Sequence, residues 1–210
     1  MSVLCDRDIR KLCDYWSEFS PEHRPPPPSD WKPMLEPFSE GVSGGGVISY
    51  GLTSAGYDLR LAHGQLMFRK NRGIVIDPKR FKEEGYSDSV LELAVLDQFG
   101  GGLVLPPHAY VLGQSVEYIR MPRWLKGHCV GKSTYARCCV LINTTPLEPG
   151  WHGTLTIEIG NVSDVPVMIY PGEGIAQLEF HELSGEPAVD YAAKGGKYQG
   201  QTEVTPARVK

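Results

Sequence analysis

Glycine and proline interrupt this chain too often for it to form many long helices. The 210 residues include 24 glycines and 17 prolines, spread along the chain. Both residue types mark turns, so this spacing is typical of many short strands joined by tight turns. An amphipathic pattern over 6–17, with Ile9, Leu12, Cys13 and Trp16 on one side, predicts a helix, and 78–86 predicts a short helical turn. We therefore expect a mainly β fold with a few short helices.

The clearest strand pattern spans residues 154–159. Alternate side chains of a strand point to opposite faces, and here apolar and polar residues alternate without a break. Residues 165–170 and 175–183 flank a PGEG turn and predict a β-hairpin. In the 154–159 strand, the two predicted faces are Leu155, Ile157 and Ile159 on one side and Thr154, Thr156 and Glu158 on the other.

Composition divides the chain into three parts of one domain. Residues 1–46 hold the first helix, four consecutive prolines at 25–28 and a glycine-rich GVSGGG at 41–46, which we interpret as a peripheral segment ending in a flexible hinge. Residues 47–190 form the predicted β body. Residues 191–210 are rich in glycine and lysine, and we expect this tail to be disordered unless a ligand or a neighbouring subunit organises it.

Charge and cysteine content exclude several classes of protein. A net charge of −4 argues against a general nucleic-acid binder, so an anionic ligand would need a local basic pocket. No apolar run approaches the roughly 18 residues of a membrane span, and the charged start does not resemble a signal peptide, so we expect a cytoplasmic protein. Five cysteines, without C-x-x-C spacing, predict reduced thiols, with Cys138 and Cys139 as small buried filler.

Residues 131–137, GKSTYAR, are the first candidate for ligand binding. They bring an ammonium, two hydroxyls and a guanidinium within seven residues, a set suited to oxyanions. The run is not a Walker A loop, because the preceding Gly127 stands one position too close to Gly131. Taken alone, GKSTYAR is equally well explained as a polar helical turn on the surface.

Glu158 is the second candidate. A lone glutamate on the polar face of a strand is usually exposed and inert, but short threonines on the same face leave room for a ligand. A hydrolytic deaminase needs an activated water, a proton shuttle and a group that stabilises the anionic intermediate. Zinc deaminases use H-x-E and P-C-x-x-C motifs, and neither occurs here. If the chain deaminates a base, we expect it to do so without zinc.

Six segments together resemble the successive motifs of the dCTP deaminase family, within the dCTP deaminase/dUTPase superfamily. The resemblance covers about residues 47–202 and the LCDRDI start, in the family's order and spacing. GKSTYAR followed by TPLEPGW is similar to the deaminase branch rather than to plain dUTPases. The segments are ISYGLTSAGYDLRL (48–61), LVLPPHAYVLGQSVEYIRMP (103–122), GKSTYAR (131–137), NTTPLEPGWHGTLTIEIGN (143–161), YPGEGIAQLEF (170–180) and YAAKGGKYQGQT (191–202).

The resemblance implies a dUTPase-like distorted β-barrel or jelly roll, assembled as a homotrimer with active sites between subunits. It implies hydrolysis of dCTP to dUTP and ammonia for pyrimidine deoxynucleotide synthesis, with Mg²⁺ held by the triphosphate and no metal ligand from the protein. dTTP is an expected inhibitor. Glu158 matches the acid–base residue, and Ser133 and Arg137 match residues that position the water and the base and stabilise charge.

The same resemblance assigns the nucleotide-binding residues. Thr156 and Ile157 are expected to read the pyrimidine through their backbone, Glu148 and Trp151 to lie near the sugar, and the tail to close over the nucleotide. The full implied set is Lys132, Ser133, Thr134, Tyr135, Ala136, Arg137, Glu148, Trp151, Thr156, Ile157, Glu158, Gln177, Tyr191, Lys197 and Gln201.

Two other functions remain open from the sequence. One is a dUTPase or a bifunctional deaminase/dUTPase that releases pyrophosphate. Thr145-Pro146 stands where bifunctional members tend to have Ala-Gly, and Glu148 replaces an aspartate, which argues against that activity. The other is a non-catalytic nucleotide-binding regulatory module on the same fold. The joint presence of Ser133, Arg137 and Glu158 argues against it.

Overall fold

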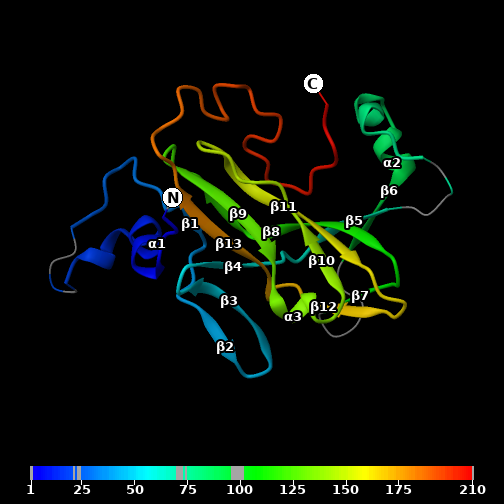
Figure 1. Cartoon of the computed structure of the whole chain (residues 1–210), viewed down its shortest axis with the longest axis horizontal. Coiled ribbons are helices and arrows are strands. Elements are labelled where there is room, and N and C mark those ends of the chain that lie inside the picture. Colours follow the sequence, from blue (N-terminus) through cyan, green and yellow to red (C-terminus); the bar gives the residue numbers. More distant parts are fainter. Residues whose placement is uncertain are drawn as a thin grey trace.

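Antiparallel strands build two larger sheets and one small sheet in the described part of the chain (Figure 1). The computed structural model describes residues 2–20, 22, 25–69, 73, 75–95 and 102–209. Helical segments are α1 (Asp6–Cys13), η1 (Tyr15–Glu18), η2 (Pro78–Lys82), α2 (Tyr86–Val90) and α3 (Ser133–Ala136). The strands are β1 (Leu35–Glu36), β2 (Val42–Gly44), β3 (Val47–Thr53), β4 (Gly56–Arg60), β5 (Gln65–Arg69), β6 (Leu91–Val95), β7 (Leu103–Leu105), β8 (Tyr110–Arg120), β9 (Leu125–Gly131), β10 (Val140–Asn143), β11 (His152–Asn161), β12 (Val167–Ile169) and β13 (Gly174–Glu182).

The sheets pack their apolar faces together around one core. One sheet runs in the order β10-β11-β8-β5-β6 with β1 beside β8, another in the order β2-β3-β4-β13-β9, and β12 pairs with β7. Strands with alternating polarity supply the core, which includes the fully buried Tyr57, Ile157, Ile159 and Phe180. Each such side chain contributes about 1.5–3 kcal/mol by leaving water. The mainly β fold predicted from the sequence is confirmed.

The predicted alternation over 154–159 is confirmed on its apolar side. Leu155, Ile157 and Ile159 are buried, whereas Thr156 and Glu158 are half-buried on the other face. Thr154 is the exception, since its backbone N–H donates to the Gln201 carbonyl 2.9 Å away and the tail covers it.

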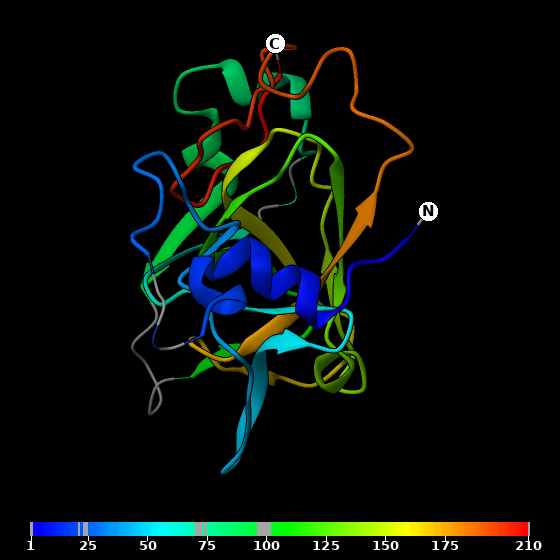
Figure 2. The ribbon, with the colours of Figure 1, turned by 90° about the vertical axis from the view of Figure 1, so that its left-hand side faces the viewer.

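The N-terminal segment is less peripheral than its composition indicated. Leu4, Ile9 and Cys13 are buried in the core, and β1 pairs with β8. Figure 2 shows the blue N-terminal helix lying against the body. The first helix ends at Cys13 rather than at residue 17, because Asp14 turns extended and its carboxylate accepts a hydrogen bond from the Trp16 N–H. Trp16 is therefore 36% exposed instead of facing the core.

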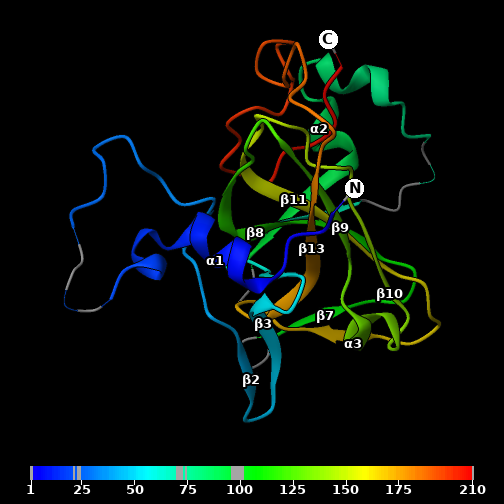
Figure 3. The same cartoon turned by 60° about the vertical axis from the view of Figure 1, so that its left-hand side comes forward.

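Two turn regions also differ from expectation. The predicted hinge at 41–46 is a hairpin: β2 pairs with β3 through a glycine turn and projects from the body (Figure 3). The predicted hairpin over 165–183 does not form, because β12 pairs with β7 while β13 lies between β4 and β9. The turn crosses between sheets instead, and the Gly172 N–H donates to the Leu61 carbonyl at 2.7 Å.

The C-terminal tail packs against its own chain. The Gly200 N–H donates to the His152 carbonyl at 2.8 Å, and Gln201 forms a parallel bridge with Gly153. The prediction that a ligand or a neighbouring subunit organises the tail stays a prediction. None of the helices formed by the described residues has the length and apolar character needed to cross a membrane.

Candidate active site

A pocket of about 390 Å³ lies between the polar face of β11 and the C-terminal tail. β8 and β11 form its floor, residues 145–151 form one wall, residues 76–81 and the ends of β5 and β6 form another, and the tail covers it. Its lining is mostly apolar or aromatic, with a few polar groups, which is typical of a small-molecule site. The residues that line it are Arg69, Ile76, Pro78, Phe81, Leu91, Tyr110, Leu112, Thr145, Pro146, Leu147, Glu148, Trp151, Leu155, Thr156, Glu158, Tyr191, Tyr198, Gln201, Thr205 and Ala207.

Glu158 presents a carboxylate to this pocket. It stands directly opposite Asn143 of β10, whose Nδ2 donates to Glu158 Oε2 at 2.8 Å. Among the described residues, no hydrogen-bond partner lies at Oε1, which is left to face a ligand. Burial raises the pKa of Glu158 and the Asn143 hydrogen bond only partly opposes it. A carboxyl with a raised pKa is suited to accept and return a proton.

The tail is fixed over the pocket by Trp151 and Thr156. Trp151 Nε1 donates to the Tyr198 carbonyl at 2.9 Å. Gln201 Nε2 donates to the Thr154 carbonyl at 2.7 Å and to Thr156 Oγ1 at 3.2 Å. Side chains that line the pocket therefore also bind the tail that covers it. A change in the position of the tail would change the contacts of Trp151 and Thr156.

The structure gathers a subset of the predicted residues in this one pocket. Besides Glu158, the predicted residues among its lining are Glu148, Trp151, Thr156, Tyr191 and Gln201. Glu148 is held near the opening by Lys126, with 3.7 Å between Nζ and Oε1. The side chain of Ile157 points into the core and is fully buried, so only its backbone is open to the predicted role.

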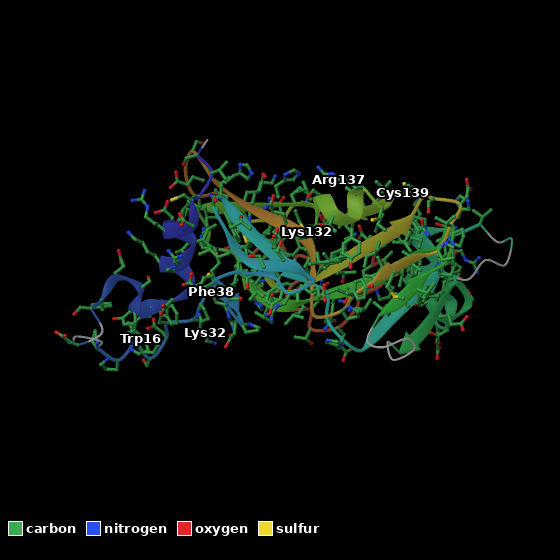
Figure 4. All side chains as sticks on the ribbon, turned by 90° about the horizontal axis from the view of Figure 1, so that it is seen from below. Trp16, Lys32, Phe38, Lys132, Arg137 and Cys139 are labelled. Atoms are coloured by element: carbon green, nitrogen blue, oxygen red, sulfur yellow. The ribbon has the colours of Figure 1, made fainter. Side chains whose placement is uncertain are left out.

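GKSTYAR lies outside the pocket. α3 sits at the opposite end of the molecule from the tail (Figures 1 and 3), and Figure 4 shows Arg137 and Cys139 on its outer side. Ser133, Thr134, Ala136 and Arg137 are exposed there. Arg137 NH1 donates to the Ser133 carbonyl at 3.0 Å, which leaves most of its donors free for an external group.

Several other predicted residues already have partners within the chain. Lys132 Nζ forms an ion pair with Asp58, and both side chains are nearly buried. Tyr135 is buried, and its hydroxyl accepts the Tyr170 N–H at 2.9 Å. Lys197 Nζ donates to the Arg208 carbonyl at 2.6 Å instead of entering the pocket. The nucleotide contacts expected of these side chains stay predictions.

Gln177 belongs to the same surface as α3. It stands on the outward face of β13 opposite Val130, and the next residue pair along, Ala176 and Gly131, leads into α3. The Lys132 N–H donates to the Ile175 carbonyl at 3.3 Å, which fixes α3 to this strand. The predicted site residues therefore fall on two separate surfaces of one chain, the pocket with Glu158 and the α3 surface with Gln177.

Several residues at or beside the pocket carry no functional signal in the sequence. Asn143 is only the first residue of a motif, and its place opposite Glu158 follows once β10 and β11 pair. Tyr110 lies close enough that burial and then the Glu158 carboxylate raise its pKa. Arg69 and Phe81 come from a region with no recognisable motif. Only the fold brings these four side chains to Glu158.

The cysteines are free thiols in the described chain, as predicted, but the predicted burial of two of them is wrong. Cys138 and Cys139 were expected to be buried, and both are exposed. The reason is the short turn after α3, where Cys139 has a φ of 60° and the chain reverses at the surface before β10 begins.

Comparison with known proteins places the chain among enzymes of one family. The model of dCTP deaminase-like proteins matches residues 42–183. A dCTP deaminase of Herpetosiphon aurantiacus is 46% identical over 209 residues, covering 100% of both chains, and one of Acidithiobacillus ferrooxidans is 40% identical over 98% of both. A crystal structure of 2'-deoxycytidine 5'-triphosphate deaminase from Agrobacterium tumefaciens shares the fold, with a TM-score of 0.54 and 19% identity over 86% of this chain and 48% of that one. The chain belongs to the dCTP deaminase family.

Proposed function

We propose that the chain is a dCTP deaminase that hydrolyses dCTP to dUTP and ammonia. The observation that carries the proposal is the half-buried Glu158 at the floor of a lidded, largely apolar pocket, in a chain nearly half identical to a dCTP deaminase along its whole length. We place the enzyme in the cytoplasm, where it supplies dUTP for deoxynucleotide synthesis.

Glu158 acts as base and then as acid in this mechanism. Its carboxylate takes a proton from water as the water oxygen bonds to C4 of cytosine, which gives a tetrahedral centre. The same proton then passes to the amino nitrogen, the C4–N bond breaks and ammonia leaves, so that Glu158 returns to a carboxylate. Asn143 keeps the carboxylate oriented through the 2.8 Å hydrogen bond. A positioned acid–base residue of this kind contributes roughly 10²–10⁴-fold to the rate.

A second copy of the chain completes the site. Ser133, Arg137 and Gln177 lie on a surface that does not reach the Glu158 pocket of the same chain. In a head-to-tail trimer, each α3 surface of one copy faces the pocket of the next. The resemblance to dCTP deaminases implies a homotrimer, and we propose this assembly because it brings the two surfaces together.

In this assembly the neighbour supplies charge stabilisation. The exposed Arg137 guanidinium faces the negative charge that develops on the base, and Ser133 holds the attacking water. A preorganised donor of this kind is worth about 3–4 kcal/mol. Trp151 packs on the sugar side and Glu148 lies near the deoxyribose hydroxyl. dTTP, which shares the sugar and triphosphate, competes for this pocket as an inhibitor.

Magnesium enters as part of the substrate. It is a hard cation that prefers oxygen ligands and is usually held through phosphates with few protein carboxylates. The pocket offers Glu148 and Glu158, and Glu148 is already paired with Lys126. This donor set fits a magnesium ion carried by the triphosphate better than one bound by protein side chains alone.

Product analysis tests the proposed reaction. The full-length protein, incubated with Mg²⁺ and dCTP, is expected to release dUTP and ammonia in equal amounts, with little turnover of CTP or dCMP. The measurement scores ammonia, pyrophosphate and nucleotides over the same time course. Thr145 and Pro146, at which the sequence departs from bifunctional relatives, line the pocket. dUMP and pyrophosphate as products would contradict the proposal and favour a bifunctional enzyme, and binding without turnover would favour a regulatory module.

Removing the tail is expected to weaken dCTP binding more than folding. Deleting residues 191–210 removes Tyr191, Tyr198 and Gln201 from the pocket but leaves both larger sheets intact. We expect at least about a tenfold rise in the Kd for dCTP, because closure over the ligand excludes water and strengthens charge interactions. Isothermal titration measures the affinity, and a thermal melt checks the fold. If the truncated protein binds dCTP with normal affinity, the tail does not act as a lid over the nucleotide.

A further inference from the structure

A group of three metal-ligating side chains lies on the outward face of β9 and β13. His128 of β9 stands directly opposite Glu179 of β13, and His181 follows two residues later on the same strand face. His128 is exposed, while Glu179 and His181 are half-buried. None of the three lines the Glu158 pocket, so the proposed deamination does not account for them.

The spacing of their donor atoms is close to that of a metal coordination sphere. His181 Nε2 lies 3.4 Å and His128 Nδ1 lies 3.9 Å from Glu179 Oε2. One donor atom from each of the three residues falls within 4.8 Å of the others. Zn²⁺ binds histidine nitrogen and carboxylate oxygen at about 2.0–2.2 Å, so tetrahedral ligands sit about 3.4 Å apart. Small rotations of the three side chains bring their donor atoms onto one ion.

An unpaired buried nitrogen of His181 is an independent indication of a ligand. Its Nε2 is buried and has no hydrogen-bond partner among the described residues. A buried polar atom without a partner costs free energy, so such atoms in folded proteins usually bind a group that satisfies them. The atom points into the group formed with Glu179, where a cation would supply the missing interaction.

We propose that His128, Glu179 and His181 bind a divalent transition-metal ion of the Zn²⁺ class, with water at the fourth position. Two imidazoles and one carboxylate suit Zn²⁺, Co²⁺, Ni²⁺ and Cu²⁺, whereas Mg²⁺ and Ca²⁺ require mainly oxygen ligands. The ion links β9 to β13, two neighbouring strands of one sheet. It serves structure or regulation and is separate from the magnesium bound with the nucleotide.

Charges around the site influence its affinity for a metal ion. Lys126 precedes His128 on the same face of β9 and stands opposite His181 across the strand pair. Its ammonium opposes a bound cation, but Glu148 partly neutralises it at 3.7 Å. Glu148 therefore reduces the repulsion between Lys126 and an ion bound by one carboxylate and two imidazole nitrogens.

Zinc titration of the full-length protein tests this site. The protein carries Cys138→Ser and Cys139→Ser, because these exposed thiols would also bind zinc. Isothermal titration with ZnCl₂ is expected to show about one ion per chain, and CoCl₂ is expected to give the visible absorption of tetrahedral Co²⁺. His128→Ala and His181→Ala should each weaken binding at least about tenfold, since even outer-shell changes cost 10–100-fold.

His108→Ala is the matched control. His108 forms an exposed pair with Asp164 at 3.0 Å and belongs to no group of three metal-ligating side chains among the described residues, so its removal should leave the zinc affinity unchanged. A thermal melt without metal checks that each variant folds, and His128 is 57% exposed at its side chain, so its replacement should not disturb the core. Zinc binding that survives His128→Ala and His181→Ala, or no binding at all, would overturn the proposal.

Discussion

Replacing Glu158 by glutamine is expected to abolish turnover while the protein still binds dCTP. Glutamine keeps the size of the side chain and an oxygen that can accept the Asn143 hydrogen bond, but it cannot take a proton from water. We expect ammonia release to fall by at least about 10³-fold, near the upper part of the range for an acid–base residue. Single-turnover ammonia assays measure the rate, and isothermal titration measures dCTP affinity.

The pH dependence of the wild type and the stability of the variant are the controls for this prediction. Because burial raises the pKa of Glu158, the acid limb of the kcat/KM profile should lie above the ordinary glutamate value of 4.5. A raised pKa in the folded state means that the native protein binds the proton more tightly, so the ionised group costs stability as pH rises through that pKa. Glutamine removes this cost, and the variant should melt no lower than the wild type at pH 7. Near-normal ammonia release from Glu158→Gln would contradict the mechanism.

Mixing two inactive variants is expected to restore activity. Glu158→Gln removes the base of the pocket and Arg137→Ala removes the exposed guanidinium of the α3 surface, so each homogeneous assembly lacks one half of every site. In mixed rings some sites pair an intact Glu158 with an intact Arg137 from the next chain. Every mixed trimer then holds one intact site out of three, so the purified mixed assemblies should show about one third of wild-type activity. Co-expression with two affinity tags and tandem purification isolates the mixed assemblies for the ammonia assay.

The control for mixing is a double variant. Combining Glu158→Gln with Arg137→Ala in one chain and mixing it with Glu158→Gln leaves no intact Glu158, so no activity should return. Arg137→Ala alone should lower the rate by about 10²–10³-fold. If mixed assemblies of the two single variants stay inactive, each site lies within one chain and the two-surface arrangement is wrong.

Local patterns in the sequence were sufficient for the class of fold and for the orientation of Glu158. Alternation over 154–159 needs only the two-residue period of a strand, and it correctly separated Ile157 from Glu158. Turn residues correctly indicated short strands. They could not indicate partners, and so the hairpin predicted over 165–183 was wrong: β13 joins β4 and β9, which lie far away in the sequence.

Sequence patterns are enough to identify a mainly β chain of the dCTP deaminase family with a glutamate on the polar face of a strand. Its motifs also named the tail and GKSTYAR as ligand-binding candidates. The tertiary structure was needed to show that the tail and Glu158 share one pocket, that Asn143 donates a hydrogen bond to Glu158, and that Arg137 lies on another surface. Strand periodicity is local, whereas strand pairing is fixed by burying apolar faces from distant parts of the chain, and that burial decides which polar side chains meet.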